Sequence, residues 1–176
     1  MRANGHEDTF YMFQQASPEA DNLWADAATT IPGALYWSSG LPGPEFRWDP
    51  LNPQRGLYRP APIAVRSWAD QDYVSHNIAE FTRTGFHGGL NYYRAMQPFF
   101  DRSSVFEGAK IMQPSLYING LEDGLSRVRN PSTQDLLVGL PGLVDHISLE
   151  NVGHWPQHEA SETVNDALLS FLKALV

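Results

Sequence analysis

The change in hydrophobic period near residue 114 is the feature that most constrains how this chain can fold. The segment "PSLYING" (residues 114–120) is a short apolar run entered by a proline and left by a turn, and "DHISLEN" (residues 145–151) reads as a second strand. Between them, "PSTQDLLVGL" has a helical pattern with proline near its start. A strand, a helix and a strand in this order predict a parallel pair joined by a crossover. An amphipathic helix is predicted over residues 161–176, with an apolar stripe of Val164, Leu168, Phe171, Leu172 and Leu175.

Residues before about 106 show helical signals and no convincing strand. Ser17 followed by Pro18 predicts a helix that continues through "PEADNLWADAA". "SWAD" (residues 67–70) fits a capping box for a second helix, for which Gly85 is a suitable stop. That helix would place Val74, Ile78 and Phe81 on one side, and "LNYYRAM" predicts a third helical segment.

A loop is predicted between these helices. Residues 40–62 hold six prolines and three glycines, which exclude long regular structure. Aromatic side chains can still order the loop, so we expect an ordered loop rather than a linker. The aromatic residues of this part of the chain could line an apolar pocket or form a core; they are Trp24, Tyr36, Trp37, Phe46, Trp48 and Tyr58.

Charge and composition restrict the classes of function. A formal net charge of −8 argues against unaided binding to nucleic acid or to an anionic membrane surface. The sequence has no cysteine, which excludes disulfides and thiolate chemistry, and no apolar run long enough to cross a membrane. We also find no signal peptide at the start, so we expect a cytoplasmic protein.

Two side chains that could carry chemistry follow the two predicted strands. Asp123 lies in "INGLEDG" and His154 in "NVGHW", and open parallel sheets place their ligands at the carboxyl ends of their strands. A carboxylate that accepts from one imidazole nitrogen fixes the tautomer, so that the other nitrogen can take a proton from water or a hydroxyl. Taken alone, an aspartate such as Asp123 is more often an ordinary turn residue, and a histidine such as His154 is more often a surface or satisfied residue. Their placement after consecutive strands supports a base with its orienting acid.

A metal site at His154 and His158 is the competing interpretation. Pro156 lies between the two histidines and disrupts the helix that would bring both onto one face, and no HExxH pattern accompanies them. We therefore expect no metal and no cofactor.

Three stretches carry a resemblance to a known family. "EFTRTGFHGGLNYYRAM" contains the pattern F-x-x-x-G-F-x-G-x-L-N-x-Y-R, and it is followed by "PSLYINGLEDGLSRV" and "NVGHWPQHEASETVNDALLSFL". Together they resemble the epoxide hydrolases of the α/β-hydrolase superfamily, and "FYMFQQASPEADNLW" resembles the first helix of their lid. The resemblance implies a partial α/β-hydrolase fold. It makes residues 1–105 a helical lid and residues 106–176 the last two parallel strands and the C-terminal helices of the core.

The resemblance also implies catalytic roles. Tyr93 becomes a lid tyrosine that donates to the epoxide oxygen, Asp123 the acid of the triad and His154 its base. A second lid tyrosine is expected, and Tyr11 is the nearest candidate. In many relatives that tyrosine stands four residues before the Phe of an FQ pair, where this chain has Thr9, so Tyr11 fits only with a shifted register. Without the resemblance, Tyr93 would be read as a packing aromatic.

The nucleophile of this family is missing from the sequence. The family uses an aspartate on a sharp turn, but no G-x-D-x-G, H-D-W-G or H-G-x-P motif occurs in the 176 residues. We therefore expect a fragment or half of a split enzyme, inactive and poorly stable alone, whose partner is the missing N-terminal half or a second copy. The expected substrate is a small apolar epoxide.

Two other functions stay open at this stage. A haloalkane dehalogenase would share the ester-forming aspartate and the base, although its halide calls for Trp or Asn donors rather than the tyrosines of "LNYYR". A degenerate, non-catalytic relative would use the aromatic lid to bind an apolar ligand or a partner.

Overall fold

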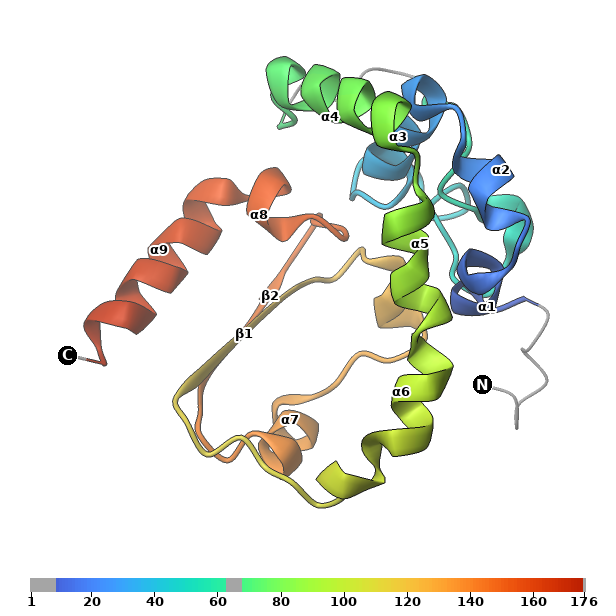
Figure 1. Cartoon of the computed structure of the whole chain (residues 1–176). Helices are drawn as coiled ribbons and strands as arrows, with labels where there is room; N and C mark the ends of the chain where they lie inside the picture. Colours follow the sequence, from blue (N-terminus) through green and yellow to red (C-terminus); the bar gives the residue numbers. More distant parts are fainter. Residues whose placement is uncertain (1–8, 63–67, 176) are drawn as a thin grey trace.

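The computed structural model describes residues 9–62 and 68–175. The elements follow one another as α1 (Tyr11–Ala16), α2 (Ala20–Trp24), α3 (Ala27–Trp37), the 3₁₀ turn η2 (Pro53–Arg55), α4 (Gln71–Thr84), α5 (His87–Arg94), α6 (Met96–Arg102), η3 (Ser103–Phe106), β1 (Ser115–Gly120), η4 (Gly124–Arg127), α7 (Thr133–Gly139), β2 (Leu143–Leu149), α8 (Pro156–Glu159) and α9 (Ser161–Lys173). We call the described residues up to 106 the helical region and residues 107–175 the C-terminal region (Figure 1).

The first helices differ from the predicted single helix that starts at Ser17. Residues 17–19 connect α1 to the short α2, and α3 starts separately after Asp26. The Asp26 carboxylate accepts from the Thr29 backbone N–H at 3.4 Å and from its hydroxyl at 2.6 Å. This cap begins a new helix inside a stretch whose composition suits a continuous one, so the prediction was wrong about the boundary.

The helix α4 was predicted correctly, but its start was not. Asp70 caps it, because its carboxylate accepts from the N–H groups of Asp72 at 2.7 Å and Tyr73 at 3.2 Å. Ser67, the predicted cap, lies outside the described residues. Gly85 ends α4 with φ of +67°, a conformation that favours glycine.

Residues 40–62 form the predicted ordered loop, with only η2 as regular structure. Arginine side chains hold it by donating to loop carbonyls. Arg47 donates to Pro42 O, Arg55 donates to Arg47 O, and Arg59 donates to Gly56 O, each at 2.8 Å. The loop therefore depends on side-chain hydrogen bonds where its prolines remove backbone donors.

The two predicted strands pair in parallel, as the sequence indicated. Tyr117 lies opposite His146 and Gly120 opposite Leu149 in the register of β1 and β2. In Figure 1 the strand pair lies between α9 on one side and α6 on the other. On α9, Val164 is buried while Leu172 is 55% exposed, so the predicted apolar stripe is only partly covered. The chain thus has the helices and small parallel sheet of a partial α/β-hydrolase fold.

Candidate active site

Asp123 follows β1 and uses its two carboxylate oxygens differently. Oδ1 accepts from the backbone N–H of Leu125 at 2.9 Å and so caps η4. Oδ2 lies 2.9 Å from Nδ1 of His154. The turn role and the role of histidine partner, which were alternatives for this residue, are therefore both present in one side chain.

The glycine before His154 allows the histidine loop to lie against other backbone. A Cβ added to Gly153 would be 2.3 Å from the Ser38 carbonyl oxygen, and one added to Gly120 would be 2.2 Å from the Gly153 carbonyl oxygen. Any side chain at these positions would separate the loop from the end of β1 or from the end of α3. Because the approach is this close, the N–H of His154 can donate to Ser38 O at 2.8 Å.

The His154 imidazole is held in one orientation. An ionised carboxylate can only accept, so Nδ1 of His154 donates to Asp123 and Nε2 keeps its lone pair. The rings of Trp48 and Trp155 make edge contacts with the imidazole, with centroids at 5.7 and 5.1 Å. This arrangement is that of a general base with an orienting acid.

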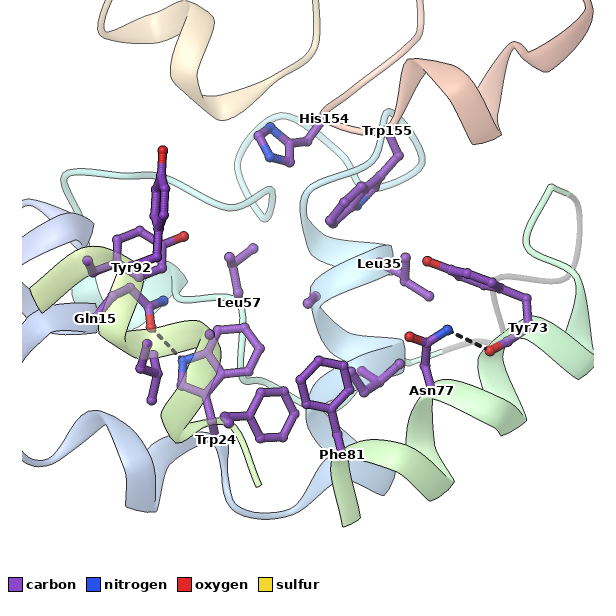
Figure 2. Close-up of a pocket in the computed structure, with 16 residues that line it drawn as sticks. Gln15, Trp24, Leu35, Leu57, Tyr73, Asn77, Phe81, Tyr92, His154 and Trp155 are labelled. Carbon is purple, nitrogen blue, oxygen red and sulfur yellow. Dashed lines mark hydrogen bonds between the residues drawn. The ribbon is translucent and has the colours of Figure 1, made fainter. Parts of the chain in front are cut away.

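His154 opens onto a cavity of about 510 Å³ between the helices of the helical region. Figure 2 shows His154 and Trp155 at one side of the cavity, with Trp24 and Phe81 across from them. Its lining is mainly apolar, with a few polar side chains, and consists of Gln15, Trp24, Ile31, Ala34, Leu35, Leu57, Tyr73, Asn77, Phe81, Phe86, Gly89, Leu90, Tyr92, Tyr93, His154 and Trp155. A cavity of this size and character suits a small apolar ligand.

The two tyrosines that the sequence singled out lie next to each other. Tyr93 lines the cavity, and its ring makes an edge contact with the ring of Tyr11 at 6.0 Å. Tyr11 also contacts Trp48 at 5.1 Å, and Trp48 in turn contacts His154. All four predicted site residues are thus brought into one cluster, although Tyr11 is not among the residues that line the cavity.

Burial changes the acidity of both phenols. It raises the pKa of Tyr11 to about 12, with smaller contributions from Tyr93, Asp123 and Tyr92, and it also raises the pKa of Tyr93. An uncharged phenol donates a hydrogen bond, so both hydroxyls are donors at neutral pH and in mild alkali. Tyr93, which lines the cavity, can as such a donor stabilise negative charge that develops on an oxygen there.

The helix that carries Tyr93 is anchored by its next residue. The guanidinium of Arg94 donates to the Asp21 carboxylate at 2.5 Å and to Ser17 O at 3.2 Å. These bonds tie α5 to the segment around α2. The hydrogen bond from Arg94 also lowers the pKa of Asp21.

Several cavity residues were missed from the sequence. Tyr73, Asn77 and Phe81 follow one another at intervals of four along α4, a spacing that could have indicated a shared face toward the cavity. Gln15 is 6% exposed and lines the cavity, and no sequence signal pointed to it. Of the six aromatic residues proposed for a pocket, only Trp24 lines this one. Tyr36 and Trp48 are buried in packing, as the alternative interpretation had it.

His158 does not join His154. Its ring stacks on Trp68 with centroids 6.1 Å apart and lies 5.2 Å from the ring of Tyr73. Within residues 9–62 and 68–175, no group of three or more His, Cys, Asp or Glu residues is arranged to hold a metal ion. In the same residues, no helix is long and apolar enough to span a membrane.

Comparisons with known proteins give a consistent result. No family profile matches the chain. An epoxide hydrolase of Caballeronia sordidicola is 55% identical over 175 residues, which are 99% of this chain and 53% of that protein. Epoxide hydrolase A of Mycobacterium tuberculosis is 35% identical over 135 residues, 76% of this chain and 38% of that one.

Solved structures agree with the sequence relatives. Epoxide hydrolase A from Mycobacterium thermoresistibile superposes with a TM-score of 0.82 at 32% identity, over 98% of this chain and 55% of that chain. An epoxide hydrolase from an endophytic Streptomyces gives a TM-score of 0.84 at 26% identity, over 99% and 56%. The chain spans about half the length of the curated relatives it matches.

These proteins all carry the name epoxide hydrolase, so the comparisons do not favour a dehalogenase or a non-catalytic relative. The chain belongs to the epoxide hydrolase family of the α/β-hydrolase superfamily and matches the C-terminal portion of its members.

Proposed function

We propose that this chain supplies the base, its orienting acid and two hydroxyl donors to an active site that hydrolyses a small apolar epoxide to a diol. One observation carries the proposal: His154, held by Asp123 at 2.9 Å, and Tyr93 border the same cavity. A base and a donor on one apolar cavity suit a reaction in which an alkoxide forms and an ester is then hydrolysed.

The first step requires a carboxylate nucleophile from polypeptide outside these 176 residues. One of its oxygens attacks an epoxide carbon, and the bond between that carbon and the ring oxygen breaks. The ring oxygen leaves as an alkoxide and takes a proton from the hydroxyl of Tyr93 or Tyr11. The product of this step is a hydroxyalkyl ester of the nucleophile.

His154 acts in the second step. Its Nε2 takes a proton from water, and the resulting hydroxide adds to the ester carbonyl carbon, while Asp123 stabilises the imidazolium. When the intermediate collapses, the ester bond breaks, the diol leaves and the nucleophile carboxylate is restored. The imidazolium returns its proton, directly or through water, to the phenolate formed in the first step.

The division of the chain follows from this assignment. We propose residues 1–105 as the lid over the active site and residues 106–176 as part of the α/β core beneath it. The cytoplasmic location, the absence of nucleic-acid and membrane partners, and a partner that is the missing N-terminal half or a second copy stay predictions.

The experiment is a chimera in which this chain replaces the matching half of the Caballeronia sordidicola epoxide hydrolase. We expect the chimera to convert styrene oxide to its diol, and the isolated chain to be inactive. His154→Gln should lower turnover by roughly 10²–10⁴-fold and Tyr93→Phe by roughly 10²-fold. Turnover of styrene oxide by the isolated chain would contradict the proposal. So would a folded chimera whose turnover is the same with and without His154→Gln and Tyr93→Phe.

A further inference from the structure

The carboxylate of Glu159 is surrounded by backbone N–H groups from two separate parts of the chain. Oε1 and Oε2 accept from Gly153 N at 3.1 and 3.0 Å, and Oε1 also accepts from Trp155 N at 3.0 Å. Oε2 accepts from Gly40 N at 2.8 Å. Three backbone amides therefore meet at one carboxylate.

We propose that Glu159 is a positioning residue that fixes the His154 loop against the helical region. The catalytic meaning of this inference rests on the proposed function, whereas the geometric part can be tested without turnover. Glu159 does not line the cavity, and its hydrogen bonds go to the residues on either side of His154 and to Gly40, so it acts through the backbone that flanks the histidine.

The N–H groups of three consecutive residues, 153–155, are all engaged. Those of Gly153 and Trp155 donate to Glu159, and the one between them, on His154, donates to Ser38 O at 2.8 Å. Each of these three backbone donors thus has a defined acceptor. The imidazole is oriented by this backbone on one side and by Asp123 on the other.

The role of Glu159 goes beyond simple helix capping. Glu159 is the last residue of the four-residue α8, and its bond to Trp155 alone would be an ordinary contact at the start of that helix. The bond from Gly40 connects α8 to the loop just after α3, because Gly40 is 119 residues from Glu159 in sequence. There the indole N–H of Trp155 also donates to the Ser38 hydroxyl at 2.7 Å.

The three N–H donors around Glu159 require a carboxylate. An amide would offer one acceptor oxygen, and its NH₂ group would face N–H donors with which it cannot bond. Gly153 is buried, so an N–H that lost its acceptor there would be left without water. No basic side chain forms an ion pair with Glu159 in the described part of the chain, which leaves the three amides as its partners.

The experiment is NMR spectroscopy of the ¹⁵N-labelled full chain in dilute solution, with Glu159→Gln compared with Glu162→Gln, a control at an exposed glutamate in the first turn of α9. We expect Glu159→Gln to speed hydrogen exchange at Gly40, Gly153 and Trp155 by about tenfold or more, since charge-assisted bonds are lost. It should also broaden the downfield Nδ1–H resonance of His154. The amide of Leu35 in α3 should not change, and Glu162→Gln should change none of these signals.

Retention of all three protections and of the His154 resonance in Glu159→Gln would overturn the proposal. If that variant does not fold, the proposal is tested by comparing the exchange rates of different amides within the unmodified chain. There, the amides of Gly40, Gly153 and Trp155 must exchange about tenfold or more slowly than that of the exposed Gly43. Equal exchange would show that the carboxylate holds nothing in place.

The chimera with the Caballeronia sordidicola relative gives the catalytic readout. Glu159→Gln should lower kcat by about tenfold and leave KM nearly unchanged, because the cavity lining is intact. An equal change in KM, or no change in kcat, counts against positioning. A chimera that is inactive with Glu159 in place would instead refute the proposed function, and the exchange result would stand.

Discussion

The helical region and the C-terminal region differ in how completely they bury their apolar side chains. Nine of the eleven buried apolar residues of the described chain lie in the helical region; the two others are Val152 and Val164. Large apolar side chains are exposed in both regions. In the helical region they include Phe99, Phe100 and Phe106, on and just after α6, and in the C-terminal region they occur before β1, on α7, on β2 and along α9, at Ile111, Met112, Val138, Val144, Leu168, Leu169, Leu172 and Leu175. The helical region thus has a core of its own, whereas the strand pair offers surfaces that nothing in the described chain covers.

The candidate active site lies where these two regions meet. Asp123 and His154 come from the C-terminal region, and Tyr11 and Tyr93 come from the helical region. Bonds such as that from His154 N to Ser38 O join the two. We call the contact between the two regions, made by Ser38 and Trp48 on one side and by Gly153 and His154 on the other, the seam. Because the buried apolar residues lie mainly in the helical region, we expect the seam to be stabilised mainly from that side.

Removing a large side chain from the helical side should have the largest effect. Trp48 is 3% exposed and contacts both Tyr11 and His154, so Trp48→Ala should lower the free energy of unfolding by about 3–5 kcal/mol. Val144→Ala, at a residue 58% exposed on β2, should change it by less than about 0.5 kcal/mol. Urea denaturation measures both. Similar losses for the two variants would mean that the regions are equally well packed.

A substitution at the seam should have the next largest effect. Gly153→Ala would place a Cβ 2.3 Å from Ser38 O and 2.6 Å from Ser39 Cα, so both backbones must move, at a cost of about 1–3 kcal/mol. Gly139→Ala, where a Cβ meets nothing within 4 Å, is the matched control. Thermal unfolding should show a lower Tm only for Gly153→Ala. An unchanged Tm there would show that the approach of the two regions is not tight.

Alkaline pH should weaken the seam through Tyr11. Its pKa is about 12 when folded and near 10 when unfolded, so the unfolded state loses its proton first as the pH rises. The stability that this phenol contributes is complete below pH 10 and is lost between about pH 10 and 12, an effect on the order of 1–2 kcal/mol. Phenolate absorbance should show one titration near pH 12 that Tyr11→Phe removes. If every tyrosine titrates near 10, Tyr11 is not buried at the seam.

The smallest effect is expected in the exposed face of α5. Gly88 lies in this helix with open space around it, so Gly88→Ala should stabilise the chain by up to about 1 kcal/mol through helix propensity. Gly85→Ala is the control, because the φ of +67° at Gly85 should make the same change destabilising. Urea midpoints distinguish the two signs. Destabilisation by Gly88→Ala would mean that this face of α5 is packed.

How far the sequence predicted the fold depended on whether the signals were local. The strands, α4 with its stop at Gly85, and the proline-rich loop follow from period and from turn residues, and they were predicted correctly. Helix starts were predicted less well, because several residues that could cap a helix stand close together in "SPEADNLWAD" and "SWAD"; in the structure α3 is capped by Asp26 and α4 by Asp70.

The candidate site shows the same limit. Asp123 and His154 could be singled out because each follows a strand, and Tyr93 because of the resemblance carried by "LNYYR". The position of Trp48 between Tyr11 and His154, and the bond from Gly40 N to Glu159, depend on contacts between residues far apart in sequence. No spacing rule reports such contacts, so they appear only in three dimensions.

The central claim is that His154 hydrolyses an ester whose formation the phenols assist. Mass spectrometry of the chimera with the Caballeronia sordidicola relative, after mixing with styrene oxide, tests it most directly. We predict that His154→Gln accumulates a covalent adduct heavier by the mass of one epoxide on a residue outside this chain, and that the double variant Tyr11→Phe, Tyr93→Phe forms none. A His154→Gln chimera that turns over normally, or an adduct that forms equally fast without both phenols, would contradict the claim.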